Sequence, residues 1–141
     1  MIDDLYQKDL LRLAAAATGA GRLESPSASV TVDNPLCGDR VTIDIHWADG
    51  RITTLAHNVK GCVLCQASAA VVGAHAAGQT TESLIRVRDS VRDMLEGKGD
   101  ADGGWEELGS FTPVATHKSR HQCVLLPLNA VVQAAEKAGA N

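Results

Sequence analysis

The residues of this 141-residue chain whose types and spacing could do chemistry are three cysteines and one aspartate. Cys37 and Asp39 stand two apart across Gly38, whose flexible backbone lets both side chains point at one ion. Cys62 and Cys123 could supply two further thiolates. Thiolates are soft ligands, whereas a carboxylate is a hard ligand that exchanges more easily. The set therefore predicts zinc or an iron–sulfur cluster, in a site that can open.

Some of these segments also have ordinary structural interpretations. Segment 34–39 (NPLCGD) suits equally well a turn that buries Cys37 while Asp39 caps its own backbone. Cys62 and Cys65 form a C-x2-C pair that could be a redox dithiol, but such a motif expects a βαβ context. We therefore expect Cys65 to be a small apolar side chain on a helix, and Cys62 to lie at that helix's N-terminus, where the dipole favours thiolate.

Two polar residues come shortly before Cys123. Arg120 could hold a negatively charged sulfur or a carboxylate, and it could equally be a solvated surface residue. His121 is a further candidate ligand, although its closeness to Cys123 argues that its side chain points elsewhere. The other four histidines are expected to be structural: His46 and His57 facing solvent from strands, His75 on a helix, and His117 in a polar loop.

Helices and an antiparallel sheet must position these residues. Strand-like alternation occurs three times, and Asp49 and Gly50 between the last two runs predict a tight hairpin turn. Helical spacing or Ala-rich composition marks the remaining apolar segments. Strands are expected at 29–33, 41–47 and 51–59. Helices are expected at 2–17 and 62–77, then from a cap at Thr80 or Thr81 through apolar positions up to Leu95, and at 126–138 with Pro127 in the first turn. A short turn is expected at 105–108.

The predicted fold class is therefore α+β, with a three-stranded antiparallel sheet packed against helices. We expect the metal site at one end of the sheet, where three loops converge. The length of 141 residues and the 45% of apolar residues suit a single domain, 1–141, with its own core.

Charge and composition argue against several classes of protein. The net charge of −4 and the lack of a basic block argue against nucleic-acid binding. No apolar run approaches the roughly 20 residues of a membrane helix. Asp3 and Asp4 stand where a signal peptide carries positive charge, so a cytoplasmic location is expected. Four cysteines there favour metal or thiol chemistry over disulfides.

Together these segments resemble the U-type iron–sulfur cluster assembly scaffolds, the family of NifU N-terminal domains, IscU and SufU. The likeness lies in P-x-C-G-D at 35–39, in G-C at 61–62 followed by QASA at 66–69, and in R-x-x-C at 120–123 before a terminal helix. Gln122 stands where IscU proteins carry His, and 111–119 lacks their Leu-Pro-Pro-Val-Lys segment. The long stretch between Cys62 and Cys123 is also more similar to SufU, whereas Cys65 departs from the family pattern.

The resemblance implies a SufE/NifU-like fold and zinc held by the residues matching Cys37, Asp39, Cys62 and Cys123. It implies a SufS-like cysteine desulfurase as partner. That enzyme's persulfide sulfur would pass to Cys37, with support from Arg120, and then to downstream assembly or recipient proteins. Likeness to IscU implies instead a transient [2Fe–2S] cluster on the same residues. A zinc-stabilised binding module without transfer chemistry is the alternative from another class, although structural zinc usually prefers four Cys or His ligands.

Overall fold

A three-stranded antiparallel sheet with strand order β1-β2-β3 organises the fold, as the sequence predicts. The computed structural model describes residues 8–36, 38–99 and 104–140. The expected helical residues 2–7 therefore lie outside the described part of the chain. The elements are α2 (Lys8–Ala16), β1 (Ala28–Asn34), β2 (Asp39–Ala48), β3 (Arg51–Lys60), α3 (Val63–His75), α4 (Thr81–Leu95), the 3-10 helices η1 (Glu106–Thr116) and η2 (Lys118–Arg120), and α5 (His121–Gly139).

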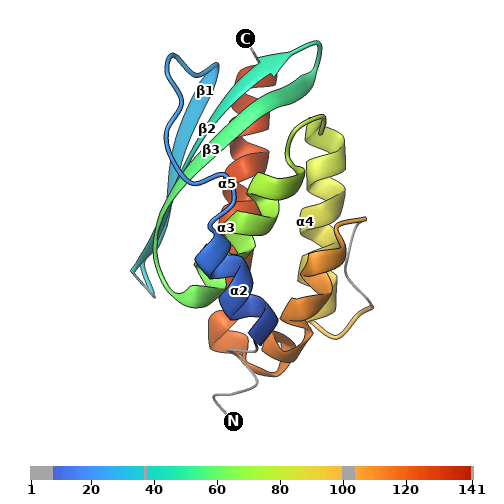
Figure 1. Ribbon diagram of the computed structural model, residues 1–141. Helices are drawn as coiled ribbons and strands as arrows, with labels where there is room; N and C mark the ends of the chain where they lie inside the picture. The colour runs from blue at the N-terminus through green and yellow to red at the C-terminus, as the bar shows by residue number, and fades with distance from the viewer. Residues whose placement is uncertain (1–7, 37, 100–103, 141) are drawn as a thin grey trace.

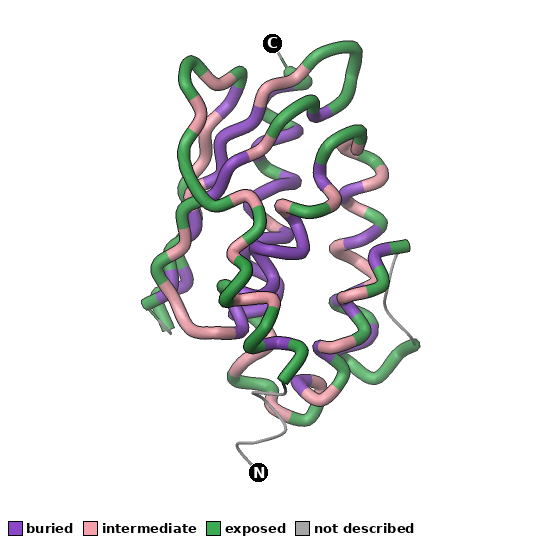
Figure 2. Tube along the Cα trace, viewed as in Figure 1, coloured by how far each residue is buried: buried purple, intermediate pink, exposed green. Residues whose placement is uncertain are grey.

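Helices α3 and α5 lie against one face of the sheet, α2 packs on α3, and α4 packs on α5 (Figure 1). Burial is concentrated where the sheet and these helices face one another (Figure 2). Val41, Ile43 and Ile45 of β2 point to this core because alternate residues of a strand share a face. Thr31 and Thr42 form an exposed hydrogen-bonded pair on the opposite face.

The turn between β2 and β3 is the tight one expected from its sequence. Asp49 and Gly50 have φ angles of 55° and 75°. Two successive positive φ values are typical of the primed hairpin turns, whose twist matches that of the paired strands. The turn fixes the β2–β3 register, apart from an irregularity between His46 and Trp47.

The last helix begins earlier than predicted. It starts at His121, so Cys123 lies within its first turn and Pro127 in its interior. The prediction was wrong because Pro127 was taken as a marker of the first turn. A proline there cannot donate to the Cys123 carbonyl four residues earlier. The Ser68 hydroxyl donates at 2.6 Å to the neighbouring Val124 carbonyl, which supports the chain near this point.

His57 faces the core, and the expectation that it faces solvent was wrong. It pairs with Ile43 and shares its side of β3 with Leu55 and Val59. Its Nε2 bonds the Thr18 carbonyl at 2.8 Å, and its buried Nδ1 has no hydrogen-bond partner in the described part of the chain. Burial lowers the pKa of His57, and the hydrogen bond to the Thr18 carbonyl offsets only part of that effect.

The other expected segments need smaller corrections. Thr80 is the N-cap of α4, and it exchanges hydrogen bonds with Ser83 in a capping box. The short turn expected at 105–108 is instead the longer 3-10 helix η1.

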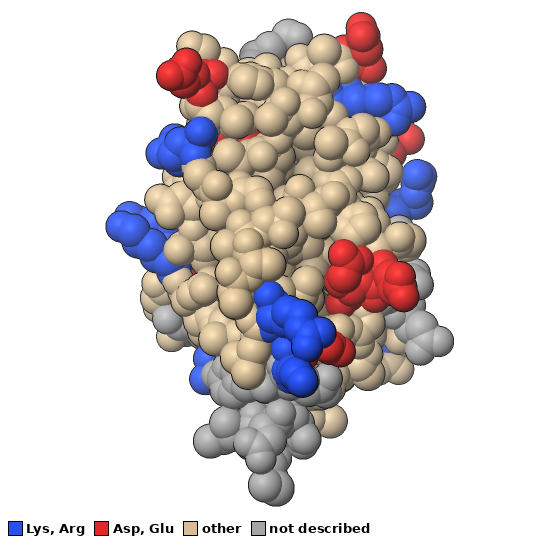
Figure 3. Space-filling view, viewed as in Figure 1, with Lys and Arg blue, Asp and Glu red and all other residues tan. Residues whose placement is uncertain are grey.

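No helix within the described ranges is long and apolar enough to cross a membrane. Charged side chains form small groups on the face seen in Figure 3, several with basic and acidic side chains next to each other, and wide uncharged areas lie between the groups.

Candidate metal centre

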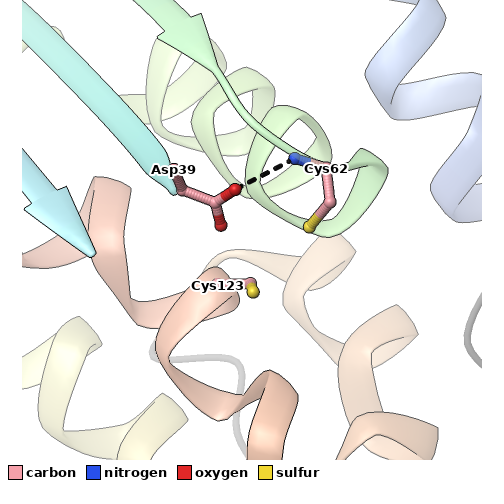
Figure 4. Close-up of side chains that lie close together, drawn as sticks. All are labelled: Asp39, Cys62 and Cys123. Carbon is pink, nitrogen blue, oxygen red and sulfur yellow. Dashed lines mark hydrogen bonds between the residues drawn. The ribbon is translucent and has the colours of Figure 1, made fainter. Parts of the chain in front are cut away.

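Asp39, Cys62 and Cys123 come together at the end of the sheet opposite the β2–β3 turn (Figure 4). One carboxylate oxygen and the two sulfur atoms all lie within 4.8 Å of one another. The three residues come from β2, from the junction of β3 with α3, and from α5. Three segments distant in the sequence thus converge at one end of the sheet.

A different local feature positions each of the three side chains. Asp39 is the first residue of β2 and continues the core-facing row of Val41 and Ile43. Cys62 has extended φ and ψ angles of −73° and 172° and is the N-cap of α3. Cys123 is fully buried in the first turn of α5. The site therefore lies over the N-termini of two helices, whose partial positive charge favours anionic groups.

The two oxygens of Asp39 have different surroundings. Oδ1 accepts a hydrogen bond from the backbone N–H of Cys62 at 3.3 Å. Oδ2 is buried and has no hydrogen-bond partner among the described residues, and Asp39 is only 3% exposed. A buried carboxylate oxygen without a partner is costly unless a cation or a donor satisfies it. Asp39 therefore has a free ligand atom.

Gly61 leaves the space that the Asp39 carboxylate occupies. A Cβ atom built on Gly61 would lie 2.8 Å from Oδ1 and 3.0 Å from Cγ of Asp39. Gly61 is not among the glycines with positive φ, so the reason for glycine here is space and not backbone conformation. A side chain at position 61 would therefore require the Asp39 carboxylate to move.

The donor set suits zinc or an iron–sulfur cluster. Three atoms no more than 4.8 Å apart share a centre at most about 2.8 Å away, close to the zinc–sulfur bond of about 2.3 Å. Two thiols and a carboxylate match the soft and borderline metals rather than calcium or magnesium. The unpaired Oδ2 of Asp39, and the space beside Gly61 that the Asp39 carboxylate occupies, are features expected of a site that can hold a cation.

The other predicted site residues have varied positions. Cys37, the expected fourth ligand and sulfur acceptor, lies outside the described residues. Arg120 is half-buried at the N-cap of α5, three residues before Cys123. The His121 ring bonds the Ala115 carbonyl at 3.0 Å and does not join the three-ligand group. Cys65 is fully buried in the core, as its apolar interpretation expects.

Sequence reasoning passed over Asn34 and the spatial role of Gly61. Asn34 is 6% exposed and is the direct cross-strand partner of Asp39. Both residues belong to motifs that the sequence displays, N-P before the first cysteine and G-C at the second. These motifs contain Asn34 and Gly61, but nothing in the sequence places Asn34 opposite Asp39 or the Gly61 backbone against the Asp39 carboxylate.

Comparisons with known proteins agree with this architecture. The family model described as "NifU-like N terminal domain" matches residues 5–116. The crystal structure of a nitrogen-fixing NifU-like protein (N-terminal) from Brucella abortus superposes with a TM-score of 0.93 at 36% identity, covering 99% of this chain and 98% of that one. A putative scaffold protein for the SUF system from Fervidobacterium islandicum shares the fold, with a TM-score of 0.86 at 22% identity over 94% of this chain and 98% of that one.

Two curated relatives carry different functional names. The chain is 22% identical over 133 residues to the iron–sulfur cluster assembly scaffold protein IscU of Thermotoga maritima, covering 94% of each. It is 23% identical over 137 residues to the zinc-dependent sulfurtransferase SufU of Bacillus subtilis, covering 96% of this chain and 92% of that protein. These nearly equal identities do not separate the two kinds of relative.

Proposed function

The chain belongs to the NifU-like N-terminal domain family, and on that basis we propose that it is a SufU-like protein of iron–sulfur cluster assembly. It holds zinc through Cys37, Asp39, Cys62 and Cys123, and accepts persulfide sulfur on Cys37 from a SufS-like cysteine desulfurase. The observation that carries the proposal is the group of Asp39, Cys62 and Cys123, with one carboxylate oxygen left free for a cation.

The transfer is a thiol–persulfide exchange. The Cys37 thiolate attacks the outer sulfur of the donor's persulfide, the donor's S–S bond breaks, and the donor leaves as a thiolate. The outer sulfur is then bonded to Cys37, and no outside oxidant or reductant is required. Zinc in the site would keep the ligand thiols deprotonated. Arg120, near the start of α5, would steady the anionic sulfur.

Two features of the ligand group support a site of transfer in place of a purely structural zinc site. No histidine belongs to the ligand group among the described residues, and His121 is engaged with the Ala115 carbonyl. The carboxylate supplies the exchangeable ligand that a site of transfer needs, whereas a purely structural zinc site is usually closed by Cys and His. Gln122 in place of His and the long stretch before Cys123 support the SufU-like branch.

A scaffold for a transient [2Fe–2S] cluster is the second candidate, favoured by the similarity to the Thermotoga maritima IscU protein. The same thiolates and carboxylate would hold the cluster. Anaerobic purification followed by metal analysis and a visible spectrum separates the two. Stoichiometric zinc and a colourless protein support the first candidate, and iron with a visible absorption band supports the second.

Sulfur acceptance is tested with a cysteine desulfurase and cysteine. The zinc-loaded protein should gain the mass of one sulfur atom, and peptide mapping should place it on Cys37. Cys37→Ser should abolish the gain, and Cys65→Ser should not. Transfer that survives loss of Cys37 but needs Cys123 would favour the cluster scaffold. Zinc without any sulfur gain would instead indicate a zinc-stabilised binding module.

A further inference from the structure

A second buried polar atom without a partner lies beside the Asp39 carboxylate. Asn34 and Asp39 are direct cross-strand partners at the end of the paired region of β1 and β2. Their side chains therefore point to the same, helix-covered face of the sheet. Asp39 Oδ2 is a buried acceptor and Asn34 Nδ2 a buried donor, yet neither has a hydrogen-bond partner among the described residues. This corner thus holds one acceptor and one donor that could each take a contact from a bound group.

The orientation of the Asn34 amide is fixed by its own backbone contacts. Oδ1 accepts the Leu36 N–H at 3.2 Å, and the Asn34 carbonyl accepts the Gly38 N–H at 2.8 Å. Exchanging the amide oxygen and nitrogen would set two donors against each other, so the unpaired atom is the NH2 group. Asn34 therefore accepts hydrogen bonds from the N–H groups of Leu36 and Gly38, while its NH2 group has no partner among the described residues.

An open hollow adjoins this corner. It has a volume of roughly 480 Å³ and is lined by both Asn34 and Asp39. Lys60 and Arg40 also line it, although Arg40 pairs with Asp33 at 2.6 Å. The carboxylates of Asp33 and Asp39 line the hollow as well, so the attraction for an anionic visitor comes from the Lys60 ammonium. A hydrogen bond to a charged acceptor is also stronger than one to a neutral acceptor.

We propose that Asn34 contacts the sulfur substrate, its Nδ2 donating a hydrogen bond to the anionic persulfide sulfur that reaches the Asp39–Cys62–Cys123 group. This inference rests on the proposed function. Asn34 forms no covalent bond in the transfer, and its NH2 group stabilises charge on the outer sulfur as the S–S bond is exchanged. The Nδ2 donor has no hydrogen-bond partner among the described residues.

Substitutions at Asn34 separate sulfur contact from loop support. Asn34→Ser keeps a side-chain oxygen that can accept the Leu36 N–H, but it withdraws the NH2 group. Asn34→Ala removes both. The probe is cysteine persulfide, which needs no protein partner to dock. The rate of sulfur gain is followed by mass, and zinc retention is followed with a chromophoric chelator. Asn58→Ser is the matched control, because Asn58 is exposed on β3.

We expect Asn34→Ser to retain zinc and the parent melting temperature while accepting sulfur at least about tenfold more slowly, the loss expected for a hydrogen bond to a charged group. Asn34→Ala should accept sulfur as slowly as Asn34→Ser, and Asn58→Ser should accept it at the parent rate. The proposal is overturned if Asn34→Ser accepts sulfur at the parent rate, or loses zinc and sulfur together, because Asn34 would then only support the loop. If the parent protein accepts no sulfur, the proposed function itself fails.

Discussion

Oδ1 of Asp39 accepts a hydrogen bond from the backbone N–H of Cys62 at 3.3 Å, which ties the first residue of β2 to the residue that begins α3. The bond uses one carboxylate oxygen and holds the carboxylate so that the other remains free. Asp39 thus has one oxygen with a structural role and one oxygen that is a candidate ligand. The two roles can be separated by substitution, because an amide retains the first and loses the second.

Asp39→Asn and Asp39→Ala should both release zinc at least about tenfold faster than the parent protein, the lower end of what loss of a partner around a metal costs. Only Asp39→Ala also loses the hydrogen bond to the Cys62 N–H, so comparing the two metal-free melting temperatures isolates that bond. Zinc release to a chromophoric chelator provides the measurement. Unchanged zinc content and exchange in both variants would reduce Asp39 to a turn residue.

Gly61→Ala should weaken the metal site through Asp39 alone. The added Cβ would approach Oδ1 to 2.8 Å, so the carboxylate must move. Overpacking of this kind costs about 1–3 kcal/mol in folding free energy. Zinc titration measures the loss of metal affinity, and chemical denaturation measures the loss of folding free energy.

Gly109→Ala is the control for Gly61→Ala. A Cβ on Gly109 would meet nothing within 4 Å, and Gly109 is not among the glycines with positive φ. Zinc affinity that is equal in the two variants would show that the space at Gly61 does not serve the site.

Cys65→Ser should keep zinc and sulfur acceptance but lose stability. Cys65 is fully buried in the apolar core and outside the three-ligand group. A hydroxyl there costs about 1–3 kcal/mol unless it finds a partner. Cys62→Ser should instead lose zinc and sulfur acceptance but keep stability, because Cys62 is half-buried and is one of the three candidate ligands. Zinc content and urea denaturation distinguish the two variants. Loss of zinc in Cys65→Ser would contradict the placement of Cys65 in the core.

Acidification should destabilise the fold through His57. Burial lowers the pKa of His57 in the folded protein below its ordinary value of about 6.5, so below that pH the unfolded chain binds the proton more readily. Stability from neutral His57 is therefore fully present above about pH 6.5 and is lost as pH falls toward the folded pKa. The loss per pH unit cannot exceed about 1.4 kcal/mol for one proton.

Urea denaturation between pH 7.5 and pH 5 tests this dependence. His57→Gln, whose side chain does not titrate there, should flatten the curve. His46→Gln is the control, since His46 is half-exposed on β2. The same slope in the parent protein and His57→Gln would mean that other groups cause the acid sensitivity.

Much of the fold could be predicted because its signals are local. Alternation in β2 and β3 and the Asp49–Gly50 turn specify a hairpin without reference to the rest of the chain. Thr80 likewise marks the start of α4. The failures arose where tertiary packing overrode a local rule. Pro127 lies inside α5, and His57 faces the core among apolar neighbours of its strand.

The sequence by itself determined the ligand types, the three strands and the placement of Cys62 at a helix start, because each depends on residues a few positions apart. Only the tertiary structure decided that Asp39, Cys62 and Cys123 share one point, and that Asn34 faces Asp39. Those relationships depend on strand register and on how α3 and α5 pack against the sheet. Such packing joins residues far apart in the chain, and local periodicity carries no information about it.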